Sequence, residues 1–197
     1  DPRRHREGIY FKYTKNIEGL AIEIIGLDTR YFRSPLQGKK NAYVQNKDSE
    51  ATILGQDQWL WLEKSIRNSS AEIIIILSSI QILATNHPYE KWDNFPLERE
   101  RLLKLLGHTA KNKTLIAISG DRHRSGIYQN EDFIEITASS LNKTASQNIE
   151  TDPLLLGQTY PIKNYGTLDI EPNKNIITVS IFDQYGTKLN SKIINIY

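Results

Sequence analysis

The sequence predicts an α/β fold, and three patterns carry that prediction. Two short apolar runs, at residues 72–77 and 114–118, are rich in β-branched residues, as strands covered on both faces are. Segments with apolar residues at helical spacing lie at residues 55–67 and 97–106. After the second of these runs, the predicted elements are strands alone. Strand–helix units followed by an antiparallel run indicate layered sheets flanked by helices.

The composition is that of one globular domain. The chain has 197 residues, of which 39% are hydrophobic, which is enough for a sizeable core and too many for wholesale disorder. The formal net charge of +2 is too close to neutral for a dedicated nucleic-acid binder. Cysteine is absent, which excludes disulfides and a cysteine nucleophile. No apolar run approaches the roughly 20 residues that span a bilayer. No signal peptide opens the chain, but a missing first half would have carried it.

The predicted strands fall into two groups. Residues 8–14 and 20–27 read as a pair of strands, and we expect residues 72–77 and 114–119 to form adjacent buried strands. Residues 35–50 are polar without periodicity, so we expect a surface loop there. Further strands are expected at residues 133–137, 166–171, 176–182 and 188–196, with a hairpin connection at 183–186. The long polar stretch between them, 139–163, has one apolar anchor at residues 154–156.

Both predicted helices are amphipathic. In the first, Trp59, Leu62 and Ile66 recur at spacings of three and four and share one face. The second is expected to begin after Pro96 and to end at Gly107. Its first turns alternate acidic and basic residues at 98–101, which we interpret as a solvated, salt-bridged face.

The motif Ser119-Gly120-Asp121-Arg122-His123 directly follows a predicted buried strand. A carboxylate and an imidazole two residues apart at a strand end can point into one cleft, where they would be ligands for a metal ion. Gly120 would allow a tight turn and a close approach to a bound group. The alternative is a strand-ending turn with a capping Asp121 and a surface His123.

Several neighbours are candidates for substrate contact. A guanidinium suits phosphate recognition, so Arg122 and Arg124 are candidates, although most arginines are solvated surface groups. The loop at residues 85–96 follows a buried strand, where sites often lie. Its Trp92 would either wall a pocket or belong to the core, and its Asn94 would either bond a phosphate oxygen or cap the next helix.

Two further interpretations assign structural roles. His87, in the same loop, follows an asparagine, but we interpret it as part of a turn rather than as a ligand. Asp28 and Arg30 lie at the end of a predicted strand, where we favour a structural ion pair over a catalytic role.

A series of collinear motifs extends from residue 1 to about residue 182. They are Asp1-Pro2-Arg3-Arg4, Leu27-Asp28-Thr29-Arg30-Tyr31-Phe32-Arg33-Ser34-Pro35-Leu36, Ile53-Leu54-Gly55-Gln56-Asp57-Gln58-Trp59, Ser78-Ser79-Ile80-Gln81, Glu90-Lys91-Trp92-Asp93-Asn94-Phe95-Pro96, Glu98-Arg99-Glu100-Arg101, Ser119 to His123, and Asn164-Tyr165-Gly166-Thr167-Leu168. In this order and composition the chain resembles the C-terminal portion of the alkaline phosphatase D (PhoD-like) family of metallophosphoesterases.

The resemblance implies a fold and a chemistry. The fold would be the calcineurin-like metallophosphoesterase sandwich of two mixed sheets flanked by helices, with residues 1–197 as the C-terminal portion of a single domain. Asp121 and His123 would ligate metal, with iron and calcium as the implied ions and other divalent metals as alternatives. Family members are often exported, so the resemblance implies a periplasmic or secreted location.

The resemblance also implies a missing portion. The family's first metal-binding segments normally precede the region that resembles Asp1 to Arg4. Because this chain starts with Asp and contains no Met, we expect a truncated piece, a processed product or one product of a split gene. Such a chain would expose apolar surface or a sheet edge, which favours self-association.

The leading functional prediction is metal-dependent hydrolysis of phosphate mono- or diesters, with this chain supplying part of the metal site and being weak or inactive alone. The alternative is a non-catalytic binding module that retains the scaffold. A nucleic-acid-binding role is disfavoured by the balanced charge.

Overall fold

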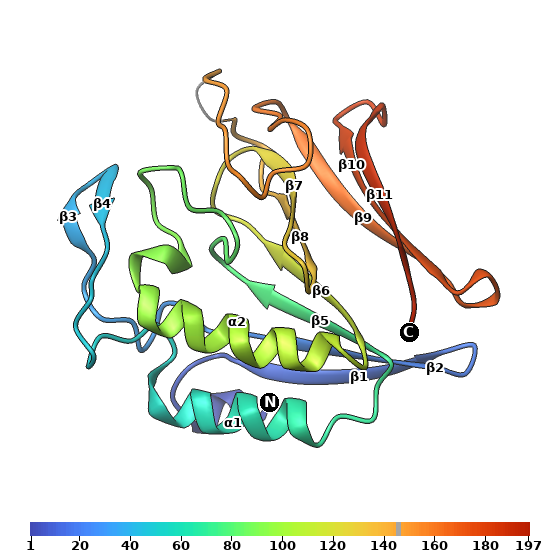
Figure 1. The fold of residues 1–197 in the computed structure, drawn as a ribbon, viewed down its shortest axis with the longest axis horizontal. Coiled ribbons are helices and arrows are strands. Elements are labelled where there is room, and N and C mark those ends of the chain that lie inside the picture. The colour runs from blue at the N-terminus through green and yellow to red at the C-terminus, as the bar shows by residue number, and fades with distance from the viewer. Residues whose placement is uncertain (145–146) are drawn as a thin grey trace.

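The computed structural model describes residues 1–144 and 147–197 and confirms the α/β fold. Its helices and strands are, in chain order, β1 (Phe11–Ile17), β2 (Leu20–Gly26), β3 (Gln37–Lys39), β4 (Ala42–Val44), α1 (Gly55–Arg67), β5 (Ile73–Ser78), α2 (Pro96–Ala110), β6 (Thr114–Ser119), β7 (Ser125–Gln129), β8 (Ile134–Ala138), β9 (Asn164–Glu171), β10 (Ile176–Asp183) and β11 (Lys188–Asn195). Short 3-10 turns lie at Pro2–His5, Trp92–Asn94 and Pro172–Lys174. Figure 1 shows these elements as layers, with α1 and α2 on one side of a large sheet and β9, β10 and β11 beyond its other side.

The large sheet has six strands in the order β1-β2-β5-β6-β8-β7. Its central pairs β2–β5, β5–β6 and β6–β8 are parallel, and the outer pairs β1–β2 and β7–β8 are antiparallel. The predicted adjacency of the two isoleucine-rich strands is confirmed, because Ile73 to Ser78 pair in register with Thr114 to Ser119. The carboxyl ends of β2, β5 and β6 therefore meet at one edge of the sheet.

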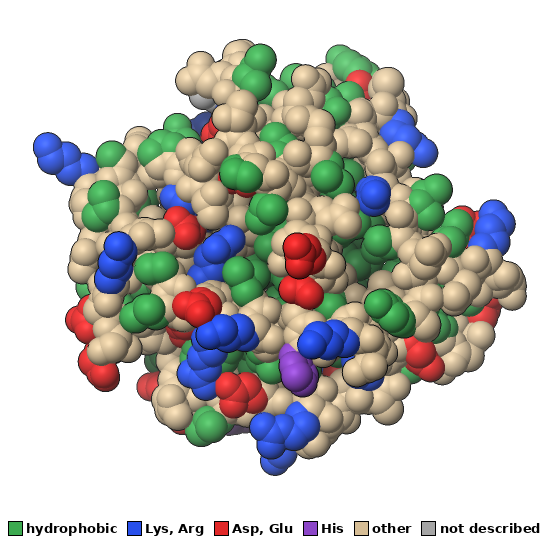
Figure 2. All heavy atoms as spheres, viewed as in Figure 1, with side chains coloured by type: hydrophobic (Ala, Val, Ile, Leu, Met, Phe, Trp, Pro, Cys, Tyr) green, Lys and Arg blue, Asp and Glu red, His purple; other side chains and the backbone are tan. Residues whose placement is uncertain are grey.

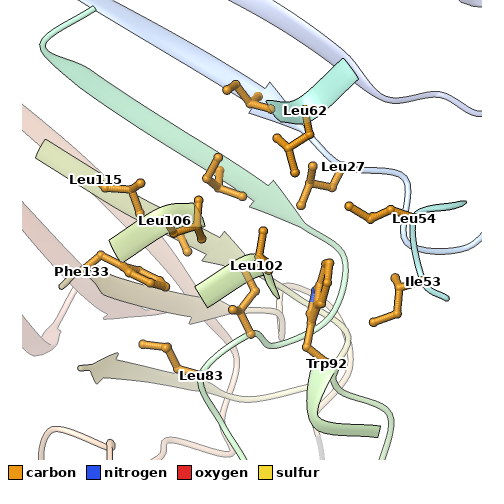
Figure 3. Close-up of a cluster of buried hydrophobic side chains, with 14 of the residues drawn as sticks. Leu27, Ile53, Leu54, Leu62, Leu83, Trp92, Leu102, Leu106, Leu115 and Phe133 are labelled. Atoms are coloured by element: carbon orange, nitrogen blue, oxygen red, sulfur yellow. The ribbon is translucent and has the colours of Figure 1, made fainter. Parts of the chain in front are cut away.

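Helices α1 and α2 cover one face of this sheet. Their apolar residues Leu62, Leu102 and Leu106 are fully buried against sheet residues such as Ile76 and Leu115. Figure 3 shows this cluster, in which Trp92 lies between α2 and the segment that holds Ile53 and Leu54. The predicted apolar face of the first helix is confirmed, since Trp59, Leu62 and Ile66 are all buried.

The other face of the sheet packs on the small antiparallel sheet of β9, β10 and β11. The inner residues Ile177, Val179 and Ile181 of β10 are fully buried against it. Cross-strand register places Ile24, Ile75, Ile116 and Ile134 in one row and Leu77, Ile118 and Ile136 in the next. Three of these residues, Ile24, Leu77 and Ile118, are only half-buried, whereas the other four are buried. The small sheet thus leaves part of this apolar face uncovered.

Three elements differ from the sequence predictions. The stretch predicted as a loop contains the β3–β4 hairpin, tethered by the Tyr43 N–H, which donates to the Pro88 carbonyl oxygen at 3.0 Å. Strand β7 was not predicted, because five residues with a glycine carry little periodicity. Helix α2 does not end at Gly107. Gly107 is buried inside the helix, and a Cβ there would lie 2.5 Å from the Asp132 carboxylate, so the glycine permits close packing.

The apolar anchor in the long polar stretch is confirmed. The Leu156 N–H donates to Ile127 O at 2.8 Å, and the Gln129 N–H donates to Leu154 O at 2.8 Å, so the anchor lies along β7. Two residues of that stretch, 145 and 146, lie outside the described part of the chain. The hairpin predicted at residues 183–186 is also confirmed between β10 and β11.

The charge alternation at the start of α2 is a solvated, salt-bridged face in part. Glu100 and Arg101 are exposed and form ion pairs, whereas Glu98 and Arg99 turn inward. Glu98 is buried and its carboxylate accepts hydrogen bonds from Thr52 Oγ1 at 2.8 Å and from the Leu54 N–H at 3.2 Å. Arg99 donates to the carbonyl oxygens of Ile82 and Leu83 at 2.7 and 2.9 Å. These two residues join α2 to the segments before α1 and after β5.

The outer surface carries charges of both signs. On the face shown in Figure 2, lysine and arginine side chains alternate with aspartate and glutamate, so that face has no continuous basic stripe among the described residues. Within residues 1–144 and 147–197, no helix combines the length and apolar character needed to cross a membrane.

Candidate metal centre at the strand ends

Polar residues gather where β2, β5 and β6 end. Asp28, Thr29 and Arg30 follow β2, Ser79 follows β5, and the motif from Gly120 to His123 follows β6. The hydroxyl oxygens of Thr29 and Ser79 are hydrogen-bonded to each other. Because these strands are parallel neighbours, residues distant in sequence come together at this edge, which is where open α/β sheets usually bind ligands.

The turn after β6 has an unusual backbone. Asp121 and His123 both adopt left-handed conformations, with φ of 66° and 53°. Gly120 does not, and a Cβ there would have room, at 3.6 Å from the Ser79 carbonyl oxygen. The expected role of Gly120 in a tight turn is therefore filled by the two candidate ligands. Left-handed conformations at residues other than glycine cost about 1–3 kcal/mol and cluster at functional sites.

Side chains alternate in direction along this turn. Asp121 and His123 are exposed, whereas Arg122 and Arg124 are 6% and 3% exposed. The arginines are held on the inner side, where Arg122 donates to the Glu150 carboxylate and Arg124 Nη1 donates to Asn148 O at 2.9 Å. The structure thus brings Asp121 and His123 to the surface and withdraws Arg122 and Arg124 from it. Contact of Arg122 and Arg124 with a substrate stays a prediction.

A different arginine lies beside the candidate ligands. Arg30 Nη2 is 3.6 Å from Asp121 Oδ1, and its Nη1 donates to Glu90 Oε2 at 3.0 Å. Glu90 also binds Arg33. Half of the Arg30 side chain is exposed, so its guanidinium is open to solvent at the strand ends. The expected Asp28–Arg30 ion pair is wrong, because the Arg30 guanidinium binds Glu90 and Asp121 instead.

Asp28 orders the backbone after β2. Its carboxylate accepts hydrogen bonds from the N–H groups of Ile9, Arg30 and Tyr31, each at 2.9 Å. Burial pushes the pKa of Asp28 upward, but these backbone hydrogen bonds outweigh burial and leave the pKa below its usual value. Asp28 therefore carries its charge into the fold and fixes where Thr29 and Arg30 lie.

The loop after β5 supports the site from within. Trp92 is fully buried, and its Nε1 donates to Ser78 Oγ at 3.0 Å. Asn94 is 1% exposed, and its Oδ1 accepts from the Lys91 N–H at 2.9 Å. Trp92 is thus a core residue and Asn94 a turn cap, and neither side chain reaches the exposed turn.

His87 packs beneath the same turn. It is 7% exposed, and its Nδ1 accepts from the Tyr89 N–H at 3.2 Å. Burial, with the nearby charges of Arg122, Lys91 and Arg124, lowers the pKa of His87 to about 2. Arg122 also lies over the Tyr89 ring, 4.5 Å from its centroid. The residue is a neutral structural histidine, as expected for a turn.

Sequence reasoning gave Arg30 a structural role and did not single out Thr29 or Ser79. All three stand just after predicted strands, so their position was a usable signal. Ser139 and Glu150, which contact the turn from the long polar stretch, carry no such signal. Their contacts depend on how that stretch folds back over the sheet.

A metal ion would find a partial set of donors here. The exposed carboxylate of Asp121 and the exposed imidazole of His123 are suitable oxygen and nitrogen ligands. Across residues 1–144 and 147–197, however, no three His, Cys, Asp or Glu side chains are grouped so that they could hold an ion. Within the described residues, the turn after β6 therefore offers two candidate ligands and not a complete set.

Comparisons with known proteins agree with this fold. A model of the PhoD-like phosphatase family matches residues 3–179. Alkaline phosphatase D of Bacillus subtilis (strain 168) is 26% identical over 110 residues, which make up 50% of this chain and 19% of that protein. The chain therefore spans about a fifth of that curated relative.

Two solved structures share the fold. A structure of PhoD superposes with a TM-score of 0.67 and 18% identity, covering 94% of this chain and 40% of that one. The purple acid phosphatase PPD1 from seeds of yellow lupin (Lupinus luteus) superposes with a TM-score of 0.55 and 14% identity, covering 94% and 32%. The fold is thus the metallophosphoesterase sandwich that the resemblance implied. Because the family model spans nearly the whole sequence, this chain belongs to the PhoD-like phosphatase family.

Proposed function

We propose that this chain is the part of a PhoD-like phosphatase that supplies Asp121 and His123 to a metal centre. The whole enzyme would hydrolyse phosphate monoesters or diesters. The observation that carries the proposal is the turn after β6, where two residues with ligand chemistry both adopt left-handed conformations. Glu18, Asn41 and Asn175 each adopt this conformation as single non-glycine residues in turns, whereas the turn after β6 holds two such residues within three positions. Strained conformations of this kind cluster at functional sites.

The residues of the chain have distinct roles in this proposal. A metal ion at such a centre supplies an activated water and neutralises phosphoryl oxygens. Asp121 and His123 would hold the ion. Arg30, which is exposed beside Asp121, would bind a phosphate oxygen through its guanidinium. Thr29 and Ser79 would support the floor of the site through their mutual hydrogen bond.

The proposed ions follow from the donor types and the family. A carboxylate paired with an imidazole suits harder ions than a pair of imidazoles does. Iron and calcium are therefore the proposed metals, with manganese and zinc as alternatives to be tested.

The proposal includes a second portion of the enzyme that provides the other ligands. The half-buried residues Ile24, Leu77 and Ile118 offer it an apolar face next to the strand ends. Packing there would complete both the sandwich and the metal centre. On the basis of the family, we place the complete enzyme in the periplasm or outside the cell.

Assays on the chain and on a longer form test the proposal. The purified chain is incubated with p-nitrophenyl phosphate and with its bis-ester, with iron, calcium, manganese or zinc added in turn. We expect little turnover, because two ligands cannot fix a catalytic centre. Robust turnover that His123→Ala abolishes would mean that the chain holds a complete site.

In a longer form that includes the second portion, Asp121→Asn and His123→Ala should each lower metal content and turnover at least tenfold. The matched controls are Asp132→Asn and His108→Asn, which alter exposed residues away from the strand ends. Equal metal content in all four variants would contradict the ligand assignment.

A non-catalytic binding module is the second candidate. It is favoured by the lack of any group of three ligating side chains within the described residues. A longer form that contains no metal and turns over neither ester would support this role instead.

A further inference from the structure

On its buried side, the turn that carries Asp121 and His123 contacts the carboxylate of Glu150 through two arginines. Glu150 Oε1 accepts from Arg122 Nη2, and Glu150 Oε2 lies 3.5 Å from Arg124 Nε. The two arginines flank His123 in sequence and are almost completely buried. Glu150 therefore binds both inward-pointing residues of the turn at once.

Ser139 fastens the backbone of the same turn. Its hydroxyl accepts a hydrogen bond from the Arg122 N–H at 3.0 Å and donates one to the Arg124 carbonyl oxygen at 3.1 Å. The Ser139 N–H donates to the same carbonyl oxygen at 3.2 Å. These bonds fix the backbone on both sides of His123.

We propose that Glu150 and Ser139 are positioning residues, which hold residues 121–124 so that Asp121 and His123 both face outward in left-handed conformations. The inference rests on the proposed function, since it takes these two residues as the metal ligands. The hydrogen bonds and ion pairs that link Glu150 and Ser139 to the turn go to Arg122 and Arg124. Glu150 and Ser139 therefore act through these two arginines.

Physical reasons support this role. A left-handed conformation at a residue other than glycine persists only where the surroundings over-determine it. Charge-assisted hydrogen bonds are the strongest such restraints, and removing Glu150 would leave two buried guanidinium groups without their carboxylate. The turn would then relax and the two ligands would no longer be held in one orientation. Pre-ordered ligands bind an ion more tightly than ligands that must be ordered on binding.

The test uses the chain itself and compares four variants. Glu150→Gln removes the charge, Glu150→Asp retains it on a shorter side chain, and Ser139→Ala removes the hydroxyl. The control, Glu63→Gln, removes a carboxylate that pairs with Arg101 at 2.7 Å on the helical surface. Circular dichroism first establishes that each variant is folded.

Two readouts follow. Nuclear magnetic resonance measures the exchange of the Arg122 amide proton and the HN–Hα couplings of Asp121 and His123, which report φ without any ion. Electron paramagnetic resonance measures the affinity for Mn²⁺ alone. We expect Glu150→Gln and Ser139→Ala to speed the Arg122 amide exchange at least tenfold and to weaken Mn²⁺ binding at least tenfold. Glu150→Asp should be intermediate and Glu63→Gln unchanged.

The outcomes separate the two proposals. If the exchange and the couplings are unchanged in folded Glu150→Gln and Ser139→Ala, the positioning role is wrong. If Glu150→Gln does not fold, the amide exchange and the couplings in Ser139→Ala and Glu150→Asp test the positioning role instead. If the native chain has no affinity for Mn²⁺ although its turn is ordered, the assignment of Asp121 and His123 as metal ligands is wrong, and the proposed function with it. The couplings then still decide whether Glu150 and Ser139 hold the turn.

Discussion

The side-chain amide of Gln58 forms two hydrogen bonds with the main chain of Asp28. The Asp28 N–H donates to Gln58 Oε1 at 2.8 Å, and Gln58 Nε2 donates to the Asp28 carbonyl oxygen at 2.9 Å. Gln58 is fully buried on α1. It therefore continues the pairing of β2 beyond its last strand residue and joins α1 to the segment that carries Thr29 and Arg30.

Gln58→Ala should destabilise the chain by about 2–4 kcal/mol, because it leaves a buried N–H and a buried carbonyl without partners. Urea unfolding followed by tryptophan fluorescence measures the change. Gln56→Ala is the matched control, since Gln56 is exposed two residues earlier on the same helix. Equal effects of the two substitutions would contradict the importance of the pair.

His87 should make stability depend on acidity. The pKa of His87 is about 2 in the fold against an ordinary value of 6.5, so the unfolded chain binds one more proton below pH 6.5. The stability that the fold has with His87 neutral is therefore fully present above pH 6.5 and is lost as the pH falls toward 2. Between pH 7.5 and 5.0 the loss amounts to about 2 kcal/mol.

Unfolding of His87→Asn in urea at those two pH values tests this dependence, because an asparagine oxygen can still accept from the Tyr89 N–H. The variant should lose less stability than the native chain on acidification. His108→Asn, which alters an exposed histidine on α2, should follow the native chain. If the native chain and His87→Asn lose the same free energy of unfolding between the two pH values, burial of His87 does not cause the pH dependence.

Glu98→Gln should be strongly destabilising. The Glu98 carboxylate accepts from Trp59 Nε1 as well as from Thr52 and from the backbone before α1. An amide can offer only one acceptor oxygen there, so a loss of about 2–4 kcal/mol is expected. Thermal or urea unfolding measures it, and Glu100→Gln on the exposed side of α2 should leave stability unchanged. If Glu98→Gln is as stable as the native chain, the structural role assigned to the Glu98 carboxylate is wrong.

The partly uncovered apolar face should cause self-association of the chain. Sedimentation velocity over a range of concentrations should show reversible oligomers, because exposed apolar patches of this kind favour association. Ile118→Thr, which keeps a β-branched residue in β6, should shift the equilibrium toward monomer. Leu60→Gln, on the exposed side of α1, should not. A native chain that stays monomeric at high concentration would contradict this prediction.

Local patterns predicted most of the scaffold, and long-range contacts account for what they missed. Helix α1 and strands β5 and β6 were predicted to within a residue or two. The apolar residues of α1 follow the pattern of a helix with one buried face, and those of β5 and β6 follow the pattern of strands buried on both faces. The role of Gly107 depends on Asp132, which lies far along the chain, so no local pattern could separate a helix end from close packing.

The candidate site divides in the same way. Asp121 and His123 were predicted from their position after a buried strand, and the structure exposes both. That Arg122 and Arg124 face inward follows from Glu150, which is more than 20 residues away in sequence. Whether an arginine is buried depends on its acidic partner, and this partner cannot be identified from the residues next to the arginine in sequence.

The strand order β6-β8-β7 has a consequence for how the chain folds during synthesis. Strand β7 is made before β8, yet β8 occupies the position beside β6. If β7 paired with β6 as soon as it was made, the antiparallel pair would have to separate again before β8 could enter. Strand β8 therefore has to reach β6 either within a preformed β7–β8 hairpin or before β7 pairs, and the edge of β6 stays open until residue 138 has left the ribosome. An open edge beside an isoleucine-rich strand invites wrong pairing, so the yield of folded chain should be sensitive to the speed of translation through this hairpin.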